Sequence, residues 1–437
     1  MRKQYLVLLA STLSALILQA QPLTRDEAVR IALKNNLGIE LARNIVAIAS
    51  TNNSYGIAGG LPVVTGSITD QENSPSFRQV YSNPASNKSS NNAFSNNLSG
   101  GINGYMLLYN GQRVVNAKRQ LNTVEAQTRQ VLSSRALLLV NNVLLKYYDV
   151  VRQQSYAKTL QSSIDAQKQQ LAIVQAQQSV GLANNADLFQ SQVDLNTQIQ
   201  NLQAQQLVID QDKTDLLTLM TLNPDSAIVV EDTILIDRTI QLSGILSAVQ
   251  DANPDVITAN MQITVNQYIE KQVGALRYPS LSMTGGYNYS RTNNSSASQY
   301  SPLFSLNYGP YVGVTLSIPI FNGNIYRKQQ EIAGINTKNA RLVRDTLLLG
   351  YTANAVKSWQ AYNNNLQQVE TAKANYDLSR KLLDLVMQKF QLKQATIVEV
   401  KNAQQSFESA GFLLVNVSYA AKAAEITLRR YANQLVQ

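Results

Sequence analysis

The chain has 437 residues, of which 44% are hydrophobic and 15% are charged, and its formal net charge at pH 7 is +9. This balance excludes an intrinsically disordered chain. Because the sequence contains no cysteine and no histidine, disulfide bonds, thiolate nucleophiles and Ser-His-Asp catalysis are excluded, and we expect no catalytic site, no cofactor and no metal site.

The first twenty residues have the pattern of a secretory signal peptide. Arg2 and Lys3 form a basic start, residues 6–18 are mostly apolar, and cleavage is expected after Ala20. A retained membrane anchor is the alternative, which the short apolar run disfavours. No later stretch has the ~18 uninterrupted apolar residues of a spanning helix. A mature chain that enters a membrane is therefore expected to do so as β-strands.

Basic residues are spread thinly along the mature chain. Without Arg2 and Lys3 the net charge falls from +9 to +7, and no block of five or six basic residues remains. Scattered lysines and arginines are typical of solvated helix faces. We therefore expect no nucleic-acid partner.

Residues 21–222 are predicted to hold a helix, two strands, a long helix and a return helix. Thr24 and Glu27 have the spacing of a capping box at the start of the first helix. The expected strands cover residues 61–70 and 97–109, the long helix 112–179, the tip 180–185 and the return helix 186–222. The return helix has a four-three apolar seam, made of Leu188, Leu195, Ile199, Leu202, Ile209, Leu216 and Met220.

Residues 242–437 are predicted to repeat this order after a linker at residues 223–241. The expected strands cover residues 279–290 and 310–321, the long helix 326–389, the tip 390–396 and the return helix 397–435. The long helix alone would approach ~100 Å, which exceeds a compact globular domain. The seam of the return helix is apolar at every position: Ala403, Phe407, Ala410, Leu414, Val417, Ala421, Ala424, Leu428, Tyr431 and Leu435.

Short motifs recur between these two halves. Tyr109-Asn110-Gly111 returns as Phe321-Asn322-Gly323, a shift of 212 residues, and residues 36–39 align with residues 253–256. Recurrence at a nearly constant spacing indicates an internally duplicated chain. We therefore expect two structural repeats.

The strand pattern is typical of a transmembrane β-barrel. Residues 281–290 alternate between apolar and polar side chains, with tyrosines near one end. A strand of a soluble β-sandwich is the alternative. Four strands cannot close a barrel, so identical chains would have to share one. We expect a membrane α+β protein with four strands per chain in a shared barrel and long coiled-coil helices beside it.

Together these features resemble the TolC-like outer-membrane efflux protein family. The similarity is carried by Leu23–Ala28 with the following segment 32–36, by the strand-to-helix turn 317–323 and by Val180-Gly181-Leu182. The resemblance implies a homotrimer with a twelve-stranded barrel in the lipid of the Gram-negative outer membrane and an α-barrel in the periplasm. It also implies a passive exit duct that receives cargo from an inner-membrane pump through a periplasmic adaptor.

The resemblance further implies that the two tips contact the adaptor. The first tip contributes Val180, Gly181 and Leu182, and the second contributes their counterparts, Leu392, Lys393 and Gln394. A glycine turn that only reverses the chain is the alternative for the first tip.

Relatives also place two acidic residues one helical turn apart at the pore entrance. The matching positions here are Glu399 and Asn402, so a single charged ring that favours cations is expected. An acid that only stabilises a helix start is the alternative. Asp187 falls where relatives hold the entrance closed, but the matching aromatic and arginine positions are Phe390 and Ala395, so this latch is expected to be altered.

Two other classes of protein remain open. One is a periplasmic coiled-coil adaptor or structural protein without a pore, although an adaptor would normally carry a small barrel domain beside a single hairpin. The other is a degradative enzyme, for which no convergent acid–base site is visible. Asp210, Asp212 and Asp215 begin like a calcium loop but lack its glycine and glutamate, and are expected to form a solvated helix face.

Overall fold

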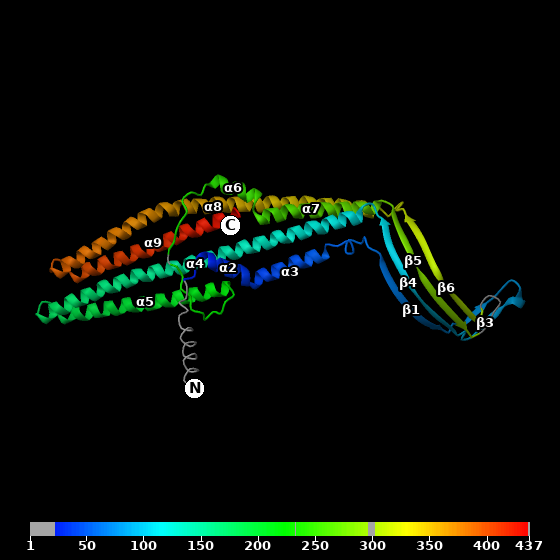
Figure 1. Cartoon of the computed structure of the whole chain (residues 1–437), viewed down its shortest axis with the longest axis horizontal. Helices are drawn as coiled ribbons and strands as arrows, with labels where there is room; N and C mark the ends of the chain where they lie inside the picture. Colours follow the sequence, from blue (N-terminus) through cyan, green and yellow to red (C-terminus); the bar gives the residue numbers. More distant parts are fainter. Residues whose placement is uncertain (1–21, 232, 296–301, 436–437) are drawn as a thin grey trace, which may run out of the picture. The chain divides into compact units, whose positions relative to one another are not determined.

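The structure is a computed structural model that describes residues 22–231, 233–295 and 302–435. The predicted signal peptide, residues 1–20, lies outside the described residues. The first half contains α2 (Arg25–Asn35), α3 (Leu37–Asn52), β1 (Val63–Asn73), β2 (Phe77–Gln79), β3 (Lys88–Ser90), β4 (Ser95–Tyr109), α4 (Arg113–Ser179) and α5 (Asn185–Leu219) (Figure 1). The second half contains α6 (Leu242–Asp251), α7 (Pro254–Gly274), β5 (Ser280–Asn294), β6 (Phe304–Ser317), α8 (Ile325–Gln391) and α9 (Ile397–Tyr431).

The chain divides into two compact units, and each takes segments from both halves of the sequence. Among the described residues, the helical unit comprises residues 22–45, Arg129–Thr258 and residues 344–435, and the sheet unit comprises Val46–Thr128 and Ala259–Val343. A predicted repeat is therefore not a unit of packing, because elements of the two halves pack against each other.

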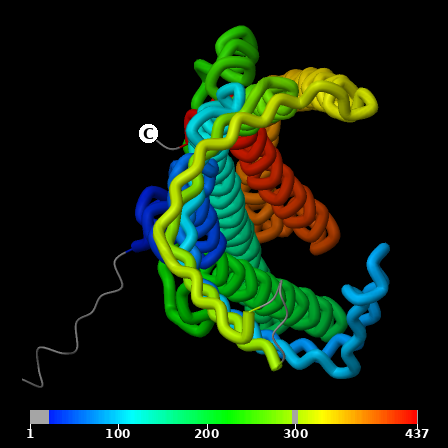
Figure 2. Tube along the Cα trace, turned by 90° about the vertical axis from the view of Figure 1, so that its right-hand side faces the viewer, coloured from blue at the N-terminus to red at the C-terminus, as the bar shows by residue number. Residues whose placement is uncertain are grey.

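The sheet unit contains a four-stranded antiparallel sheet in the order β1-β4-β5-β6. The central pairing, β4 with β5, joins the two halves and places Gly104 opposite Gly285. The strands curve along their length (Figures 1 and 2). β1 and β6 form the two edges of this sheet, so one side of each lacks a strand partner in the described chain.

The strand register separates apolar and polar side chains onto opposite faces of the sheet. The face that we call the apolar face carries Val64, Ile68, Leu98, Ile102, Met106, Met283, Tyr287, Tyr289, Leu306, Tyr308, Val312, Val314 and Leu316. Many of these side chains are strongly exposed, Ile68 at 84% and Val312 at 78%. The opposite, polar face carries Ser, Thr, Asn, Gln, Gly and Tyr with Val63 and Leu107, and none of its strand residues is charged.

Several strand boundaries differ from those expected, and β5 runs on to Asn294, past the expected end at residue 290. β6 begins at Phe304 and ends at Ser317, whereas residues 310–321 were expected. It ends early because Pro319 cannot donate a ladder hydrogen bond, and the last pair joins Ser280 to Ser317. β1 runs on to Asn73, past the expected end at residue 70, because its pairing with β4 continues to that point.

Each half begins with two helices where one was expected, and an asparagine separates them. Asn36 lies between α2 and α3, where its Oδ1 accepts hydrogen bonds from the backbone N–H groups of Gly38 (2.9 Å) and Ile39 (3.2 Å). Its Nδ2 donates to the carbonyl of Leu219, the last residue of α5, at 3.3 Å. A single side chain thus caps the start of one helix and the end of another.

Asn253 repeats this arrangement between α6 and α7. Its Oδ1 accepts from the N–H groups of Asp255 (3.0 Å) and Val256 (3.3 Å), and its Nδ2 donates to the carbonyl of Tyr431 at 3.1 Å. Tyr431 is the last residue of α9, as Leu219 is of α5. Pro254 follows at the first helical position, where its missing N–H costs nothing. We call Asn36 and Asn253 the two asparagine joints.

The backbone also takes left-handed conformations at matching positions in the two halves. These conformations tighten turns and end helices. The positive φ angles recur at a spacing of 212 residues: Gly111 and Gly323, Gln112 and Asn324, Gly181 and Lys393, and Thr221 and Asn433.

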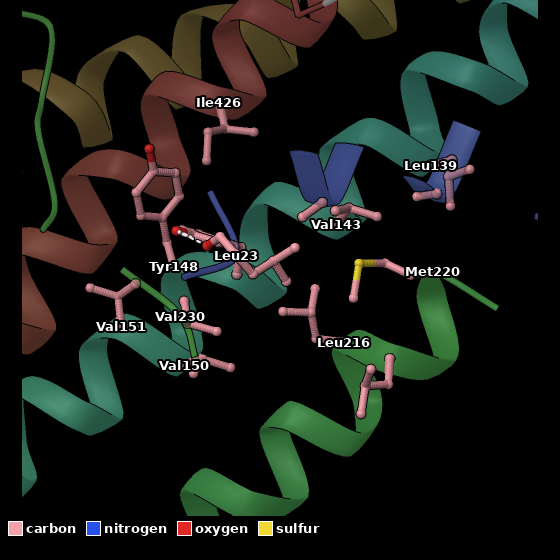
Figure 3. Packing of buried hydrophobic residues seen from close by; sticks show 14 of the residues in the cluster. Leu23, Leu139, Val143, Tyr148, Val150, Val151, Leu216, Met220, Val230 and Ile426 are labelled. Carbon is pink, nitrogen blue, oxygen red and sulfur yellow. Dashed lines mark hydrogen bonds between the residues drawn. The ribbon is translucent and has the colours of Figure 1, made fainter. Parts of the chain in front are cut away.

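The largest buried cluster lies in the helical unit, between α4, α5 and the start of the chain (Figure 3). Leu23 forms a parallel bridge with Val230 of the linker, and the hydroxyl of Tyr147 donates to the Leu23 carbonyl at 3.0 Å. Leu216 is fully buried against them. Leu23, which follows the predicted cleavage site closely, is therefore anchored between helices.

The linker is also held by an ionic network against α9. The Nζ of Lys422 lies 2.9 Å from Glu425, and both side chains are almost fully buried. Glu425 accepts the backbone N–H of Asp237 at 3.0 Å, and Arg429 pairs with the Asp237 carboxylate. Burial lowers the pKa of Lys422, while its bond to Glu425 opposes that shift. A buried pair of this kind is costly to break from one side only.

Among the described residues, no helix combines the length and the apolar character needed to cross a membrane.

The asparagine joint at Asn253 is open to a graded test. Asn253→Ala removes both the helix cap and the bond to Tyr431, and is expected to destabilise the helical unit by about 2 kcal/mol, roughly 1 kcal/mol from each. Asn253→Ser keeps a capping oxygen and is expected to lose about 1 kcal/mol. Denaturant unfolding followed by helical circular dichroism measures both. Equal stability of the alanine variant and the wild type would contradict the joint.

Candidate functional site

The tip between α4 and α5 is a tight helix end built around a glycine. Gly181 has φ +75°, and a Cβ there would meet no atom within 4 Å. The N–H of Leu182 donates to the carbonyl of Gln177 at 2.7 Å, and the N–H of Gly181 donates to that of Gln178 at 3.0 Å. These paired bonds define a Schellman motif, which satisfies the last carbonyls of α4.

The tip between α8 and α9 has the same backbone geometry without a glycine. Lys393 has φ +60°, and its N–H donates to the carbonyl of Phe390 at 3.1 Å. The N–H of Gln394 donates to that of Lys389 at 2.8 Å. A left-handed lysine costs roughly 1–2 kcal/mol relative to an ordinary helical conformation. The two tips therefore have one shape and different side chains.

The side chains at both tips present apolar surface to solvent. Val180 and Leu182 are 66% and 60% exposed, and Leu392 is 68% exposed. Exposed apolar residues that cluster at the end of a rod are typical of an interaction surface.

Glu399 closes a capping box at the start of α9. Its N–H donates to the Oγ1 of Thr396 at 3.2 Å, while its Oε2 accepts the Thr396 N–H at 2.6 Å and the Thr396 hydroxyl at 2.9 Å. These hydrogen bonds lower the pKa of the Glu399 carboxyl. The side chain is therefore ionised at neutral pH, and it is exposed to solvent.

The other two predicted entrance residues, Asn402 and Asp187, differ from Glu399 in their contacts. Asn402 is exposed on α9, three residues further along. Asp187 occupies in α5 the place that Glu399 has in α9, and its N–H donates to the Asn184 side chain at 2.7 Å. The Asp187 carboxylate itself has no hydrogen bond within the part of the chain that the structure describes.

Phe390 does not belong to the tip, although the tip was expected to begin there. It lies in the last turn of α8 and is 6% exposed. It packs in a cluster with Val174 of α4 and with Val400 and Phe407 of α9. Its ring is buried in the chain's own core, because the helical hairpin α4–α5 and the helical hairpin α8–α9 pack against each other here.

Contacts that the sequence did not reveal hold the two hairpins together. The Nζ of Lys401 on α9 lies 2.9 Å from the Asp194 carboxylate on α5. At Gly411 a Cβ would meet the Thr159 side chain at 2.5 Å, so α4 and α9 approach closely there. Figure 2 shows the pair α4–α5, teal to green, beside the pair α8–α9, orange to red.

The acidic residues that resembled a calcium loop form ion pairs with a lysine. Lys146 of α4 lies 3.0 Å from Asp212 and 2.9 Å from Asp215, both on α5. Asp210 lies 4.0 Å from Lys213. The described residues contain no group of three acidic, histidine or cysteine side chains arranged to hold a metal ion.

Comparison with known proteins gives consistent matches. The family model "Outer membrane efflux protein" matches residues 245–434. Outer membrane protein TolC of Vibrio cholerae serotype O1 is 26% identical over 349 residues, which cover 76% of each chain.

Solved structures give the same fold at lower identity. The transmembrane channel protein CusC superposes with a TM-score of 0.74 and 18% identity, covering 94% of this chain and 92% of that one. The outer membrane protein VceC of Vibrio cholerae superposes with a TM-score of 0.74 and 16% identity, covering 93% of this chain and 95% of that one. Paired helical rods joined to a two-faced sheet in this order form the helix-rich α+β fold of the outer-membrane efflux channels. The chain is thus similar to the TolC-like outer-membrane efflux proteins, over residues 245–434 in the family model and over 76% of its length in the comparison with TolC.

Proposed function

We propose that three copies of this chain form one continuous duct, with a twelve-stranded β-barrel in the outer membrane and a helical barrel in the periplasm. The similarity to outer-membrane efflux proteins supports an outer-membrane exit duct of an efflux or secretion system. The observation that supports the barrel is the sheet, with an exposed apolar face, a polar face and two free edges. Lipid does not tolerate free edges. Three sheets joined edge to edge would satisfy them and turn the polar faces inward.

The two halves are proposed to be structural repeats, residues 21–222 and 242–437, joined by the linker 223–241. The shared asparagine joints and left-handed turns support this division. In the trimer, the walls of the duct would have approximate sixfold symmetry, because each of the three chains would supply two helical hairpins and two pairs of strands. The exposed apolar face argues against a periplasmic adaptor without a pore, because such a protein would have no lipid to cover that face.

Two substitutions on opposite faces of β6 test the barrel. Val312→Lys places a charge near the middle of the apolar face, where burial in lipid costs ~2–4 kcal/mol. We expect it to reduce insertion into the outer membrane several-fold. Thr315→Lys lies on the polar face and is expected to insert normally. Membrane fractionation measures both, and recovery of the wild type as a soluble periplasmic protein would exclude the duct.

Conduction is proposed to be passive, with the drive supplied by an inner-membrane pump. The polar face of the sheet carries no charged side chain in its strands. The inner surface of the barrel would therefore be hydrated and would bind no ion tightly. The two tips are proposed to dock a periplasmic adaptor through Val180, Gly181 and Leu182, with Leu392, Lys393 and Gln394 at the second tip. The exposure of the apolar side chains at these tips supports this role.

Leu182→Asp tests the docking surface without straining the left-handed Gly181. A charge in the centre of an apolar contact is expected to lower crosslinking to the adaptor about tenfold, or roughly 1.4 kcal/mol. Gln203→Asp, an exposed position further along α5, is the matched control and is expected to crosslink normally. Equal crosslinking of the two variants would reject a docking role for the first tip.

Glu399 is proposed to form a single ring of three carboxylates at the pore entrance, with Asn402 one turn away leaving the second ring neutral. The lowered pKa of Glu399 supports a ring that stays charged. Asp187 would lie beside this ring and contribute to closure of the entrance.

Glu399→Gln separates the charge from the cap, since glutamine also completes a capping box. The variant is expected to keep its helix content and to shift the reversal potential in a salt gradient toward zero in planar bilayers. Asp377→Asn, an exposed acid of α8 away from the tip, is expected to leave the reversal potential unchanged. An unshifted potential in Glu399→Gln would rule out the ring.

A further inference from the structure

The apolar face of the sheet has a hollow over strands β1, β4 and β5. Its volume is about 830 Å³, which is large enough for part of a lipid or a small ligand. Gly66 and Gly100 lie on neighbouring strands and leave its floor without side chains, and Ile68, Ile102, Tyr287 and Tyr289 stand around it. The hollow exists because both floor positions, which face outward, are glycine.

A single positive charge lies next to this hollow. Arg291 lies on the same face as Tyr289, two residues further along β5, and pairs across the sheet with Leu98, which also lines the hollow. The Arg291 Nε is buried and has no hydrogen-bond partner within the described residues. Asp70 lies two strands away, at roughly 10 Å from strand spacing, and its carboxylate accepts a hydrogen bond from Asn96 at 2.8 Å.

The hollow and Arg291 lie toward the outer end of the sheet. The pairing of β1 with β4 runs from Val63 and Tyr105 to Asn73 and Ser95, and α4 follows the first of these ends. Since the helical extension is periplasmic in this family, the Asn73 end faces the cell exterior. The hollow therefore lies at the level of the outer leaflet, and its two tyrosines match the aromatic belt at a membrane interface.

We infer that the hollow binds an acyl chain of lipid A, with Arg291 paired to a phosphate of the same molecule. This inference rests on the proposed barrel. Lipid A fills the outer leaflet of a Gram-negative outer membrane and carries both acyl chains and phosphates. An apolar hollow accepts the chain, and a guanidinium binds phosphate bidentately. Basic sites at the membrane surface bind lipid headgroups in the same way.

The role of the Arg291 charge can be tested by native mass spectrometry. The purified channel is titrated with hexa-acylated bisphosphorylated lipid A. Arg291→Gln is expected to lower the bound fraction about tenfold, because one charge-assisted contact is lost. Arg78→Gln in β2 removes an equal charge away from the hollow and is expected to bind as the wild type. Equal binding by Arg291→Gln and the wild type would overturn the inference.

A second variant tests the hollow itself. At Gly66 a Cβ would meet nothing closer than the Gly101 carbonyl oxygen at 4.0 Å, so Gly66→Leu fills the hollow without displacing the backbone. We expect the bound fraction of lipid A to fall about tenfold. Gly313→Leu on the polar face, where the nearest atom to the new Cβ is Thr284 Oγ1 at 3.4 Å, is the matched control. Undiminished binding by Gly66→Leu would overturn the hollow as the acyl site.

Two further readouts separate this inference from the proposed function. Phosphatidylglycerol should not displace lipid A from the wild type; displacement at equal concentration would reject lipid A as the preferred occupant. Arg291→Gln and Gly66→Leu are expected to insert and conduct like the wild type in planar bilayers. Normal conduction with unchanged lipid A binding would reject the lipid site alone, whereas a wild type that never inserts would reject the duct.

Discussion

Backbone hydrogen bonding in lipid is the constraint on which the rest of this structure depends. Every N–H and C=O in the membrane needs a protein partner, and four strands leave two edges open. The chain cannot satisfy those edges alone, and its register places apolar groups on one face of the sheet and uncharged polar groups on the other. The proposed assembly of three chains would satisfy both edges. In the proposed trimer the helices would have to form matching walls, since α4 and α8 follow β4 and β6 in the chain.

The proposed duplication would build those walls from few distinct local structures. Asn36 and Asn253 each join a helix start to the end of a return helix, and a residue in the left-handed conformation closes each tip at the matching position. In a trimer, equivalent positions of the two halves would together form a ring of six side chains. Where the two halves carry different residues, each residue would instead form a ring of three. Gly181 is replaced by Lys393 and Asp187 by Glu399, which changes chemistry while the backbone remains the same. Specific function can therefore diverge at the tips without loss of the shared frame.

The sequence predicted what local patterns determine. Alternation in the strands and four-three seams in the return helices are local, and every seam position of α9 is buried or half-buried in the structure. Contacts between distant segments were not predictable. The pair of Lys401 with Asp194 and the burial of Phe390 depend on how two hairpins pack. The asparagine joints were missed because the apolar pattern continues across Asn36. The capping box was visible, since Thr396 and Glu399 have its spacing, but Glu399 was interpreted as a ring charge or as an acid at a helix start, without the reciprocal hydrogen bonds to Thr396.

The two interpretations of Glu399, helix cap and charged ring, are physically compatible. Three carboxylates near one axis raise one another's pKa, which would neutralise a ring as the pH falls. Hydrogen bonds from Thr396 favour the ionised form and lower the pKa of each carboxyl. Since this pKa lies below its unfolded value, the capping contribution is present above the unfolded pKa and is lost as the pH falls through the folded one. The cap thus counteracts the repulsion that a ring creates, and a single ring can stay charged where an uncapped one would protonate.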